Sequence, residues 1–272
     1  MPLPGVFLAK KKDGTTYYRS SITFHSKHIS LGSYDTEPLA HQAYLTASNL
    51  LKKEVKTRSL LDAPHVEDYQ KLDSSIAFDK WIMLLNLRDN GIYCSNPIYL
   101  RQNFFLYYVS ETLVLKFDTD DLFYYMKHRI MQRGGHLFVS DYGMQVNVLS
   151  RYGIKNFAVA GRDYRFVNGD TSDFRYHNIQ IINRYYGVTK SVVKGRDRYT
   201  AKLHLAGDYI IGRYATELEA AIAYNKAIAC VKNKGIDKNF QENYIDSLDD
   251  IAYAKLYNAI RISKKIREYT KN

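Results

Sequence analysis

HISLGSYDTEPLAHQAYLTAS, at residues 28–48, recurs in altered form as YIIGRYATELEAAIAYNKAIA at residues 209–229. Both stretches contain a hydrophobic residue, then Gly, any residue and Tyr, then Thr-Glu, and then Ala-x-x-Ala-Tyr. They agree at seven of the thirteen positions that run from Gly32 to Tyr44. Agreement at two separated places indicates one supersecondary unit that is used twice. The chain therefore predicts a modular protein, whose function depends on what the repeated unit contacts.

Residues 5–12 and 17–25 have the composition of strands joined by a Gly-containing turn, and a third short strand is expected at 28–34. Side chains of a strand alternate between its two faces, so each central strand predicts one core face and one solvent face. The core face holds Tyr18, Ser20, Ile22 and Phe24 in the first repeat, and Tyr199, Ala201, Leu203 and Leu205 in the second. The solvent face holds Arg19, Ser21, Thr23 and His25, and Arg198, Thr200, Lys202 and His204.

A helix is expected after each sheet. Thr36 and Thr216 are suitable N-cap residues, and each is followed by Glu, which suits the positive end of a helix. Apolar residues then recur at the i, i+3, i+4, i+7 spacing of one helix face. These residues are Ala40, Ala43, Tyr44 and Ala47 in the first repeat and Ala220, Ala223, Tyr224 and Ala227 in the second. Alanine at these positions lets the helix lie close to a small sheet.

The composition is basic and aromatic, with a formal net charge of +11, 25 Tyr and 12 Phe. This combination favours a nucleic-acid partner, and the alternative is a basic protein without a polyanionic partner. The two cysteines, Cys94 and Cys230, have no nearby partner for a metal pair or a disulfide framework, which suits a reducing cytoplasm. Neither a signal peptide nor a membrane span is predicted. We expect a cytoplasmic protein without a cofactor.

Three strands on one helix leave the other face of the sheet uncovered. A polar sheet face is usually solvated, but a major groove is wide enough to admit strands. The frame Leu31-Gly32-x-Tyr34-x-Thr36-Glu37, with Ala40-x-x-Ala43-Tyr44, and its copy from Ile211 to Tyr224 resemble the plant Apetala/ethylene-response-factor (ERF) DNA-binding domain and its versions in phage and mobile-element endonucleases. The resemblance implies a three-stranded sheet that reads the major groove. Arg19, Arg198 and Lys202 occupy suitable places, whereas the strand tryptophans of the family are absent.

The centre of the chain predicts a helix at 75–87, which contains Trp81, and aromatic-rich strands at 96–117. Residues 115–183 are similar to the His-Asn-His (HNH) homing endonucleases that carry an ERF-type domain. The order of the family is kept by Asp120-Asp121-Leu122, by Val167-Asn168-Gly169-Asp170 and by Asp173-Phe174-Arg175-Tyr176-His177-Asn178-Ile179.

Two histidine positions of that family hold other residues, because Ser150 precedes Arg151 and Phe166 follows Arg165. Phosphodiester hydrolysis needs a base and a metal ion, and Phe supplies neither. We therefore predict a scaffold with no catalytic or metal residues that keeps a DNA-contacting surface, to which Arg151, Arg162, Arg165 and Arg175 supply charge. The alternative is a homing or nicking endonuclease with a metal site relocated to Asp170, Asp173 and His177, near which Asn178 and His136 also lie.

Residues 247–269 predict one helix with an apolar stripe. This helix should dock on another module or on a second copy of the chain, which would make the protein a homo-oligomer. The stripe comprises Leu248, Ile251, Ala254 or Lys255, Asn258 or Ala259, Ile262 and Ile266.

Together these patterns predict a multi-domain α+β protein with an ERF-like module at 1–60, a degenerate HNH-like region at 61–183, and a second ERF-like module with a C-terminal helix at 184–272. Its expected function is non-catalytic binding of double-stranded DNA in a phage or mobile-element setting. A further alternative is a protein-binding inhibitor of a host enzyme. The predicted DNA-binding residues are Lys10, Arg19, Ser21, Thr23, Arg151, Arg165, Arg175, Lys190, Lys194, Arg196, Arg198, Thr200, Lys202 and Arg213.

Overall fold

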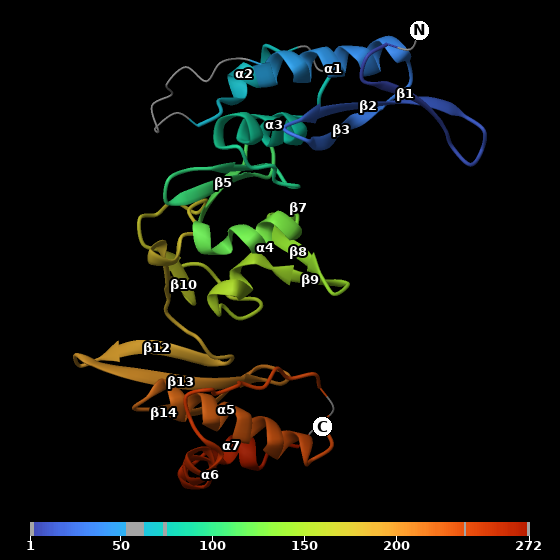
Figure 1. Ribbon diagram of the computed structural model, residues 1–272. Helices are drawn as coiled ribbons and strands as arrows, with labels where there is room; N and C mark the ends of the chain where they lie inside the picture. The colour runs from blue at the N-terminus through green and yellow to red at the C-terminus, as the bar shows by residue number, and fades with distance from the viewer. Residues whose placement is uncertain (1–2, 53–62, 73–74, 237, 271–272) are drawn as a thin grey trace. The chain divides into compact units, whose positions relative to one another are not determined.

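The computed structural model describes residues 3–52, 63–72, 75–236 and 238–270. These residues form an α+β fold of several small antiparallel sheets, which confirms the predicted class (Figure 1). Contacts group the chain into two compact units. Unit 1 comprises Met1–Val148 and Asp170–Asn178, and unit 2 comprises Leu149–Gly169 and Ile179–Asn272.

This grouping differs from the three expected modules. The expected boundary at residues 60 and 61 lies outside the described residues. Part of the expected central region, residues 149–169, groups with the second repeat. Compactness by contacts does not test independent folding, so the modules 1–60, 61–183 and 184–272 stay a prediction.

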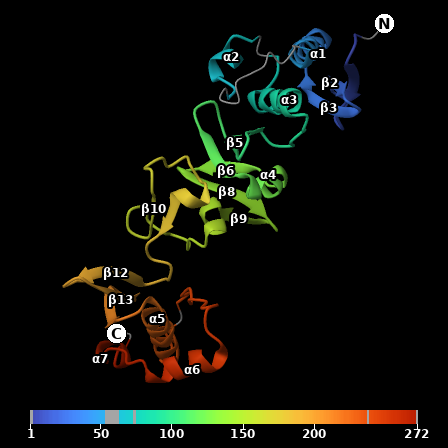
Figure 2. The same cartoon turned by 60° about the vertical axis from the view of Figure 1, so that its left-hand side comes forward.

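The first repeat forms the predicted sheet and helix. Strands β1 (Val6–Lys10), β2 (Thr16–Phe24) and β3 (Lys27–Tyr34) form an antiparallel sheet in that order, and helix α1 (Glu37–Lys52) packs on one face of it (Figure 1 and Figure 2). The alanines of the helix stripe are completely buried, so the helix backbone comes close to the sheet. These alanines are Ala40, Ala43 and Ala47.

The second repeat has the same arrangement in unit 2. Strands β12 (Val188–Val193), β13 (Arg196–His204) and β14 (Asp208–Tyr214) form the sheet, and α5 (Glu217–Lys232) covers one face. Thr216 accepts a hydrogen bond from the Glu219 N–H, and the Glu219 carboxylate accepts one from the Thr216 N–H. This capping box stabilises the predicted helix start by about 1 kcal/mol.

A glycine–tyrosine contact closes each repeat. Gly5 and Gly187 precede the first strands with φ of 75° and 67°, and a Cβ on either would overlap a tyrosine ring of the helix. The ring belongs to Tyr44 in the first repeat and to Tyr224 in the second. Only glycine combines this backbone conformation with this close approach. The tyrosine of Ala-x-x-Ala-Tyr is thus paired with a glycine that stands outside the stretches first compared.

The remaining shared residues also have structural partners. The Glu37 carboxylate accepts from the Leu3 N–H at 3.1 Å, and the Glu217 carboxylate accepts from the Arg184 N–H at 3.0 Å. Each Glu therefore holds the segment that enters its sheet. The hydroxyl groups of the repeated Gly-x-Tyr tyrosines donate to backbone carbonyls, Tyr34 to Ser75 at 2.7 Å and Tyr214 to Arg261 at 2.8 Å.

Both sheets contain a β-bulge at the same place. The register shifts between Ser20 and Ser21 in β2, and between Ala201 and Lys202 in β13. Ser21 alternates with Ser20 and Ile22 along the strand, as expected, but it is only 8% exposed, so the expectation that solvent reaches it is wrong. Ser21 lies on the central strand, where it pairs with Ser30 of β3 and its backbone N–H donates to the Gly5 carbonyl at 3.0 Å. The longer Lys202 at the equivalent place is exposed.

The rest of unit 1 follows the predicted order of a helix and then strands. The helices are α2 (Val66–Gln70) and α3 (Phe78–Asn90), and the strands are β4 (Ile98–Leu100), β5 (Phe104–Tyr108) and β6 (Val114–Asp118). The α3 helix shares one core with α1, in which Trp81 is buried. Next come η1 (Thr119–Asp121), α4 (Leu122–Lys127), and the sheet of β7 (Ile130–Arg133), β8 (His136–Asp141) and β9 (Met144–Asn147).

Unit 2 begins near the 3₁₀ helix η2 (Val148–Tyr152) and includes a two-stranded sheet of β10 (Tyr164–Phe166) and β11 (Ile179–Ile181). A further 3₁₀ helix of unit 1, η3 (Tyr176–Asn178), immediately precedes β11.

The C-terminal segment is not one helix, which corrects the expectation for 247–269. It forms α6 (Asp250–Ala259) and α7 (Lys264–Arg267), with an extended break at Ile260. Hydrogen bonds to strand β14 stabilise the break. The Ser263 N–H donates to the Ile211 carbonyl at 2.8 Å, and the Ser263 hydroxyl donates to the Ile210 carbonyl at 2.9 Å. Ile262 and Ile266 of the predicted stripe are buried in the core of unit 2, and Ile251 is exposed. The homo-oligomer stays a prediction.

Candidate nucleic-acid interface

The sheet β12–β14 has one face that α5 does not cover. By strand register this open face contains Thr189, Ser191, Val193, Arg196, Arg198, Thr200, Lys202, His204, Asp208, Ile210 and Arg213. The side chains of Ala201 and Leu203 alternate with them and are buried against α5, as the sequence predicted. We refer to these eleven residues as the open face of unit 2.

Four cations lie exposed on this open face. Arg198 lies opposite Ser191, Arg196 opposite Val193, and Arg213 opposite Thr200, and Lys202 lies opposite Ile210. Within the described part of the chain none of the four forms an ion pair. Thr200 lies at the centre of the sheet between Thr189 and Arg213. The structure therefore brings five predicted residues to one surface.

Lys194 extends this surface at the hairpin between β12 and β13. Lys194 and Gly195 both have positive φ, of 50° and 74°, and they join the paired residues Val193 and Arg196. Such a two-residue turn suits the twist of a hairpin. The turn leaves Lys194 exposed at the tip of the hairpin, with only Gly195 between it and Arg196 in the chain.

Lys190 is placed differently from its predicted neighbours. It pairs with Tyr199, so its side chain belongs to the helix side of the sheet rather than to the open face. Its ammonium lies 2.7 Å from the Asp197 carboxylate, and this hydrogen bond raises the pKa of Lys190. The Lys190 ammonium is thus paired with Asp197 on the helix side of the sheet, and the structure does not place it with the other predicted cations.

One acidic residue, Asp208, lies at one end of the open face. The His204 Nδ1 lies 2.9 Å from the Asp208 carboxylate, and this contact lowers the pKa of Asp208. The cationic residues Arg196 and Arg198 lie toward the opposite end of β13, next to the hairpin turn. The positive charge of the face is thus concentrated toward the hairpin.

The first sheet presents a different surface. Arg19 and Thr23 are exposed, and the Arg19 guanidinium donates to the Tyr17 hydroxyl at 2.8 Å and lies over its ring. Phe7, which pairs with Arg19, is 57% exposed. Lys10 pairs with Thr16, so by register it belongs to the opposite side of the sheet from Arg19.

The predicted arginines of the centre fall into different units. Arg151 of η2 and Arg165 of β10 are exposed in unit 2, and Arg165 Nε donates to Gln180 at 2.7 Å. Arg175 belongs to unit 1, where it forms a bidentate pair with buried Asp173 at 2.8 and 2.7 Å and lies over the Phe104 ring. The Arg175 guanidinium is therefore occupied by contacts within unit 1.

Both carboxylates of the relocated metal site are already paired with other side chains. The Asp170 carboxylate accepts from Ser172 and lies 3.3 Å from the Lys116 ammonium, and both contacts lower the pKa of Asp170. Asp173 is paired with Arg175, and His177 is exposed. Among the described residues no group of three or more His, Cys, Asp or Glu side chains is arranged to hold a metal ion. Phe166, at the second replaced histidine position, pairs with Ile179 in the β10–β11 sheet.

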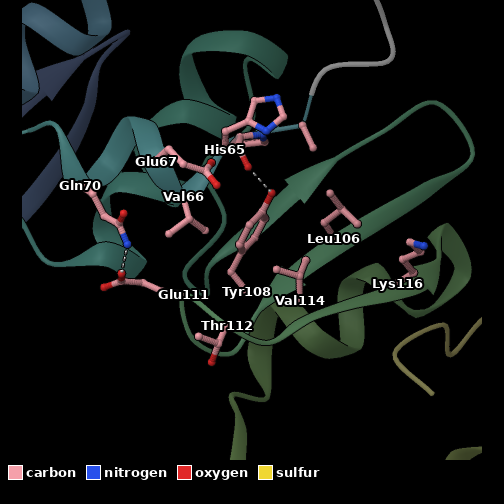
Figure 3. Close-up of a pocket in the computed structure, with 12 residues that line it drawn as sticks. His65, Val66, Glu67, Gln70, Leu106, Tyr108, Glu111, Thr112, Val114 and Lys116 are labelled. Carbon is pink, nitrogen blue, oxygen red and sulfur yellow. Dashed lines mark hydrogen bonds between the residues drawn. The ribbon is translucent and has the colours of Figure 1, made fainter. Parts of the chain in front are cut away.

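Unit 1 contains an open pocket of about 580 Å³ between α2 and the strands β5 and β6 (Figure 3). Leu106, Tyr108 and Val114 form an apolar wall, and the Tyr108 hydroxyl donates to the Pro64 carbonyl at 3.2 Å. Gln70 donates to Glu111 at the rim, at 3.4 Å. None of the predicted DNA-binding residues lines this pocket.

The net charge is divided very unequally between the units. Unit 1 has 18 Lys and Arg against 17 Asp and Glu, a net charge of +1, whereas unit 2 has 21 against 11, a net charge of +10. A strong charge asymmetry between parts of a chain is typical of nucleic-acid or membrane-surface contact. Sequence reasoning missed this division because the assignment of residues 149–178 to the two units depends on contacts between distant segments.

No helix in the described ranges has the length and apolar character that crossing a membrane requires. Comparison of this chain with protein-family models, with curated proteins and with solved structures finds no match.

Proposed function

We propose that this protein binds double-stranded DNA without cutting it, and that unit 2 makes the principal contact through its open face. One observation carries the proposal. Of the formal net charge of +11, +10 belongs to unit 2, and unit 2 presents the uncovered sheet face with its exposed cations. Lys and Arg gain affinity from phosphate contacts by releasing counterions from DNA. A small sheet can enter a major groove, where Arg198 and Lys202 would reach both the phosphates at the groove edge and the base edges within it.

The resemblance of both repeats to ERF-type domains supports the same proposal, because that family uses the uncovered face of a three-stranded sheet. Here the covered face is occupied by α5, which leaves the open face for a ligand. The resemblance also implies a phage or mobile-element setting.

The test is binding to a random-sequence duplex pool over a salt series, with Mg²⁺ and Mn²⁺ present so that the same gel reports cleavage. Five to six phosphate contacts predict a slope of log affinity against log salt of roughly −5. Retention of intact DNA with such a slope supports the proposal. Cut DNA would favour the endonuclease alternative, and no retention at low salt would refute DNA binding.

A second candidate function concerns unit 1. Its net charge is close to zero, and Phe7 and Leu8 of β1 are 57% and 63% exposed. Exposed apolar groups on a nearly neutral unit suit a protein surface better than phosphates. This observation favours the protein-binding alternative for unit 1, in which a host enzyme would be the partner. Affinity purification of partner proteins tests this alternative, with the wild-type chain compared with Phe7→Ser, which removes the exposed ring and should lose the partner.

A further inference from the structure

Phe157 is held in an unfavourable conformation on the surface of unit 2. Its φ is 62°, and its side chain is 93% exposed. A bulky residue in the left-handed region costs folding energy, and glycine or asparagine is the usual occupant. An aromatic ring that is both strained and exposed gains nothing from the core of the protein. Strain of this kind is found at sites where a side chain serves a ligand.

The turn that carries Phe157 is firmly braced. The Ala158 N–H donates to the Lys155 carbonyl at 3.3 Å, and the Val159 N–H donates to the Asp163 carboxylate at 2.9 Å. The Lys155 ammonium lies 3.2 Å from the carboxylate of buried Asp163, and the Lys155 side chain is only 10% exposed. The Asn156 N–H donates to the Tyr186 hydroxyl at 3.2 Å. These hydrogen bonds hold the backbone on both sides of Phe157, so the turn keeps the residue at the surface.

The same network reaches the proposed DNA-binding sheet. The N–H groups of Ile182 and Asn183 donate to the Asp163 carbonyl at 2.8 and 2.9 Å. The Asn183 amide oxygen accepts from the Lys190 N–H at 2.7 Å, and Lys190 lies in β12. Lys155 adds a hydrogen bond to the Tyr185 carbonyl at 2.8 Å. A short chain of contacts thus joins the Phe157 turn to β12.

We propose that Phe157 inserts its ring at a base step of the duplex that the open face of unit 2 binds, an inference that rests on the proposed function. Apolar side chains used in this way partly unstack two base pairs and kink the DNA. The ring projects from the strongly basic unit, where Arg162 in the following turn is more than half exposed. Cations and an aromatic ring together match phosphates and a base face. A protein surface would call for no such excess of positive charge.

The test uses the full chain and the duplex retained by the wild type, with 2-aminopurine placed at successive positions. Phe157→Asn removes the ring and suits the left-handed turn, so the variant should fold. Tyr244→Ala is the matched control, because Tyr244 is 87% exposed in the same unit and its neighbour Asn243 is hydrogen-bonded to α5 on the covered side of the sheet. Affinity is also compared between the matched duplex and one with a single mismatch, whose bases unstack more easily.

We expect the wild type to raise 2-aminopurine fluorescence at one step and to prefer the mismatched duplex. Phe157→Asn should lose both effects and bind roughly tenfold more weakly, the scale of one lost stacking contact. Its salt slope should be unchanged, because the ring contacts no phosphate. Tyr244→Ala should behave as the wild type.

Three other outcomes overturn the inference. If Phe157→Asn matches the wild type in fluorescence and mismatch preference, the ring does not enter the duplex, and a protein partner becomes the better explanation of its exposure. If Tyr244→Ala shows the same losses, the effect is not specific to the turn. If the wild type retains no duplex at low salt, the proposed function fails and this inference fails with it.

Discussion

At the residue scale, the two repeats offer a direct comparison of cations. Arg198 and Lys202 lie exposed on one face of their sheet, whereas Arg19 is held by Tyr17 and Lys10 belongs to the other side of its sheet. Replacing Arg198 and Lys202 by Ala should therefore weaken DNA binding by about tenfold or more, and should lower the salt slope by roughly 2.

Replacing Arg19 and Lys10 by Ala should change both quantities much less. Titration of each double variant against the same duplex at two or more salt concentrations provides the measurement. Equal losses in the two double variants would contradict the assignment of the principal contact to unit 2.

Gly187 tests the glycine–tyrosine contact. Gly187→Ala places a Cβ against the Tyr224 ring at a φ of 67°, so both strain and overlap should destabilise unit 2, by about 2–4 kcal/mol. Gly195→Ala is the matched control, because its φ is 74° and no atom lies within 4 Å of the added Cβ. Only the strain remains there, about 1 kcal/mol. Denaturant unfolding of both variants measures the difference, and equal losses would show that the ring yields.

At the element scale, the loop from η2 to β10 depends on a buried ion pair. Burial alone would raise the pKa of Asp163, but hydrogen bonds from Arg162 and the Val159 N–H, together with the Lys155 ammonium, outweigh it and hold the pKa below its usual value. Asp163→Asn leaves the Lys155 charge buried without its partner, and should lower the free energy of unfolding of unit 2 by about 3–5 kcal/mol.

The sign of the accompanying pH effect follows from that lowered pKa. The stabilising contribution of Asp163 is complete above the pKa of about 4 of an unfolded aspartate, and is lost as pH falls through the lower folded value. Wild-type stability should therefore decline more steeply below pH 4 than that of Asp163→Asn. Asp208→Asn, which breaks only an exposed pair with His204, should stay within about 1 kcal/mol of the wild type at neutral pH. Stability curves measured from pH 2 to pH 7 decide the matter.

The elements predicted from sequence are those whose pattern is local. Alternation along residues 197–205 and the alanine spacing from Ala220 to Ala227 each report one face of one element, and both are confirmed. The burial of Ser21 and the break at Ile260 were missed, because a bulge in the neighbouring strand and hydrogen bonds to β14 decide them. No local pattern records such partners.

The candidate site was predicted in part for the same reason. Arg196, Arg198, Lys202 and Arg213 follow from strand alternation around the second repeat, and the structure gathers them on one face. Lys190 and Arg175 were also expected to contact DNA, but in the structure they form ion pairs with Asp197 and Asp173. The strained exposure of Phe157 depends on a φ angle, which composition and spacing do not reveal.

At the scale of the whole molecule, the unequal charge predicts that DNA stabilises the two units differently. A ligand stabilises the folding unit that binds it, so two units that unfold separately respond differently to a ligand of one of them. Trp81, the single tryptophan, is buried in unit 1, so its fluorescence follows that unit, whereas far-ultraviolet circular dichroism follows both. Duplex DNA should raise the unfolding midpoint seen by circular dichroism and leave the tryptophan transition within about 1 °C of its position without DNA.

Thermal unfolding with and without the duplex, recorded by both probes on one sample, makes this comparison. A poly-anionic competitor such as heparin serves as a control for charge alone. A rise of the tryptophan transition that matches that of the dichroism would place the DNA contact on unit 1 as well, and would remove the distinction between the units.

The shared bulge gives the two repeats a common residue-by-residue frame, in which Tyr17 matches Arg198, Arg19 matches Thr200 and Ser21 matches Lys202. The positions that agree, from Gly5 and Gly187 to Tyr44 and Tyr224, are those that hold the fold together. Positions that differ occur on the central strands, as in these three pairs, and also along the third strands and the helices. One scaffold thus presents two chemically different outer surfaces within the same chain.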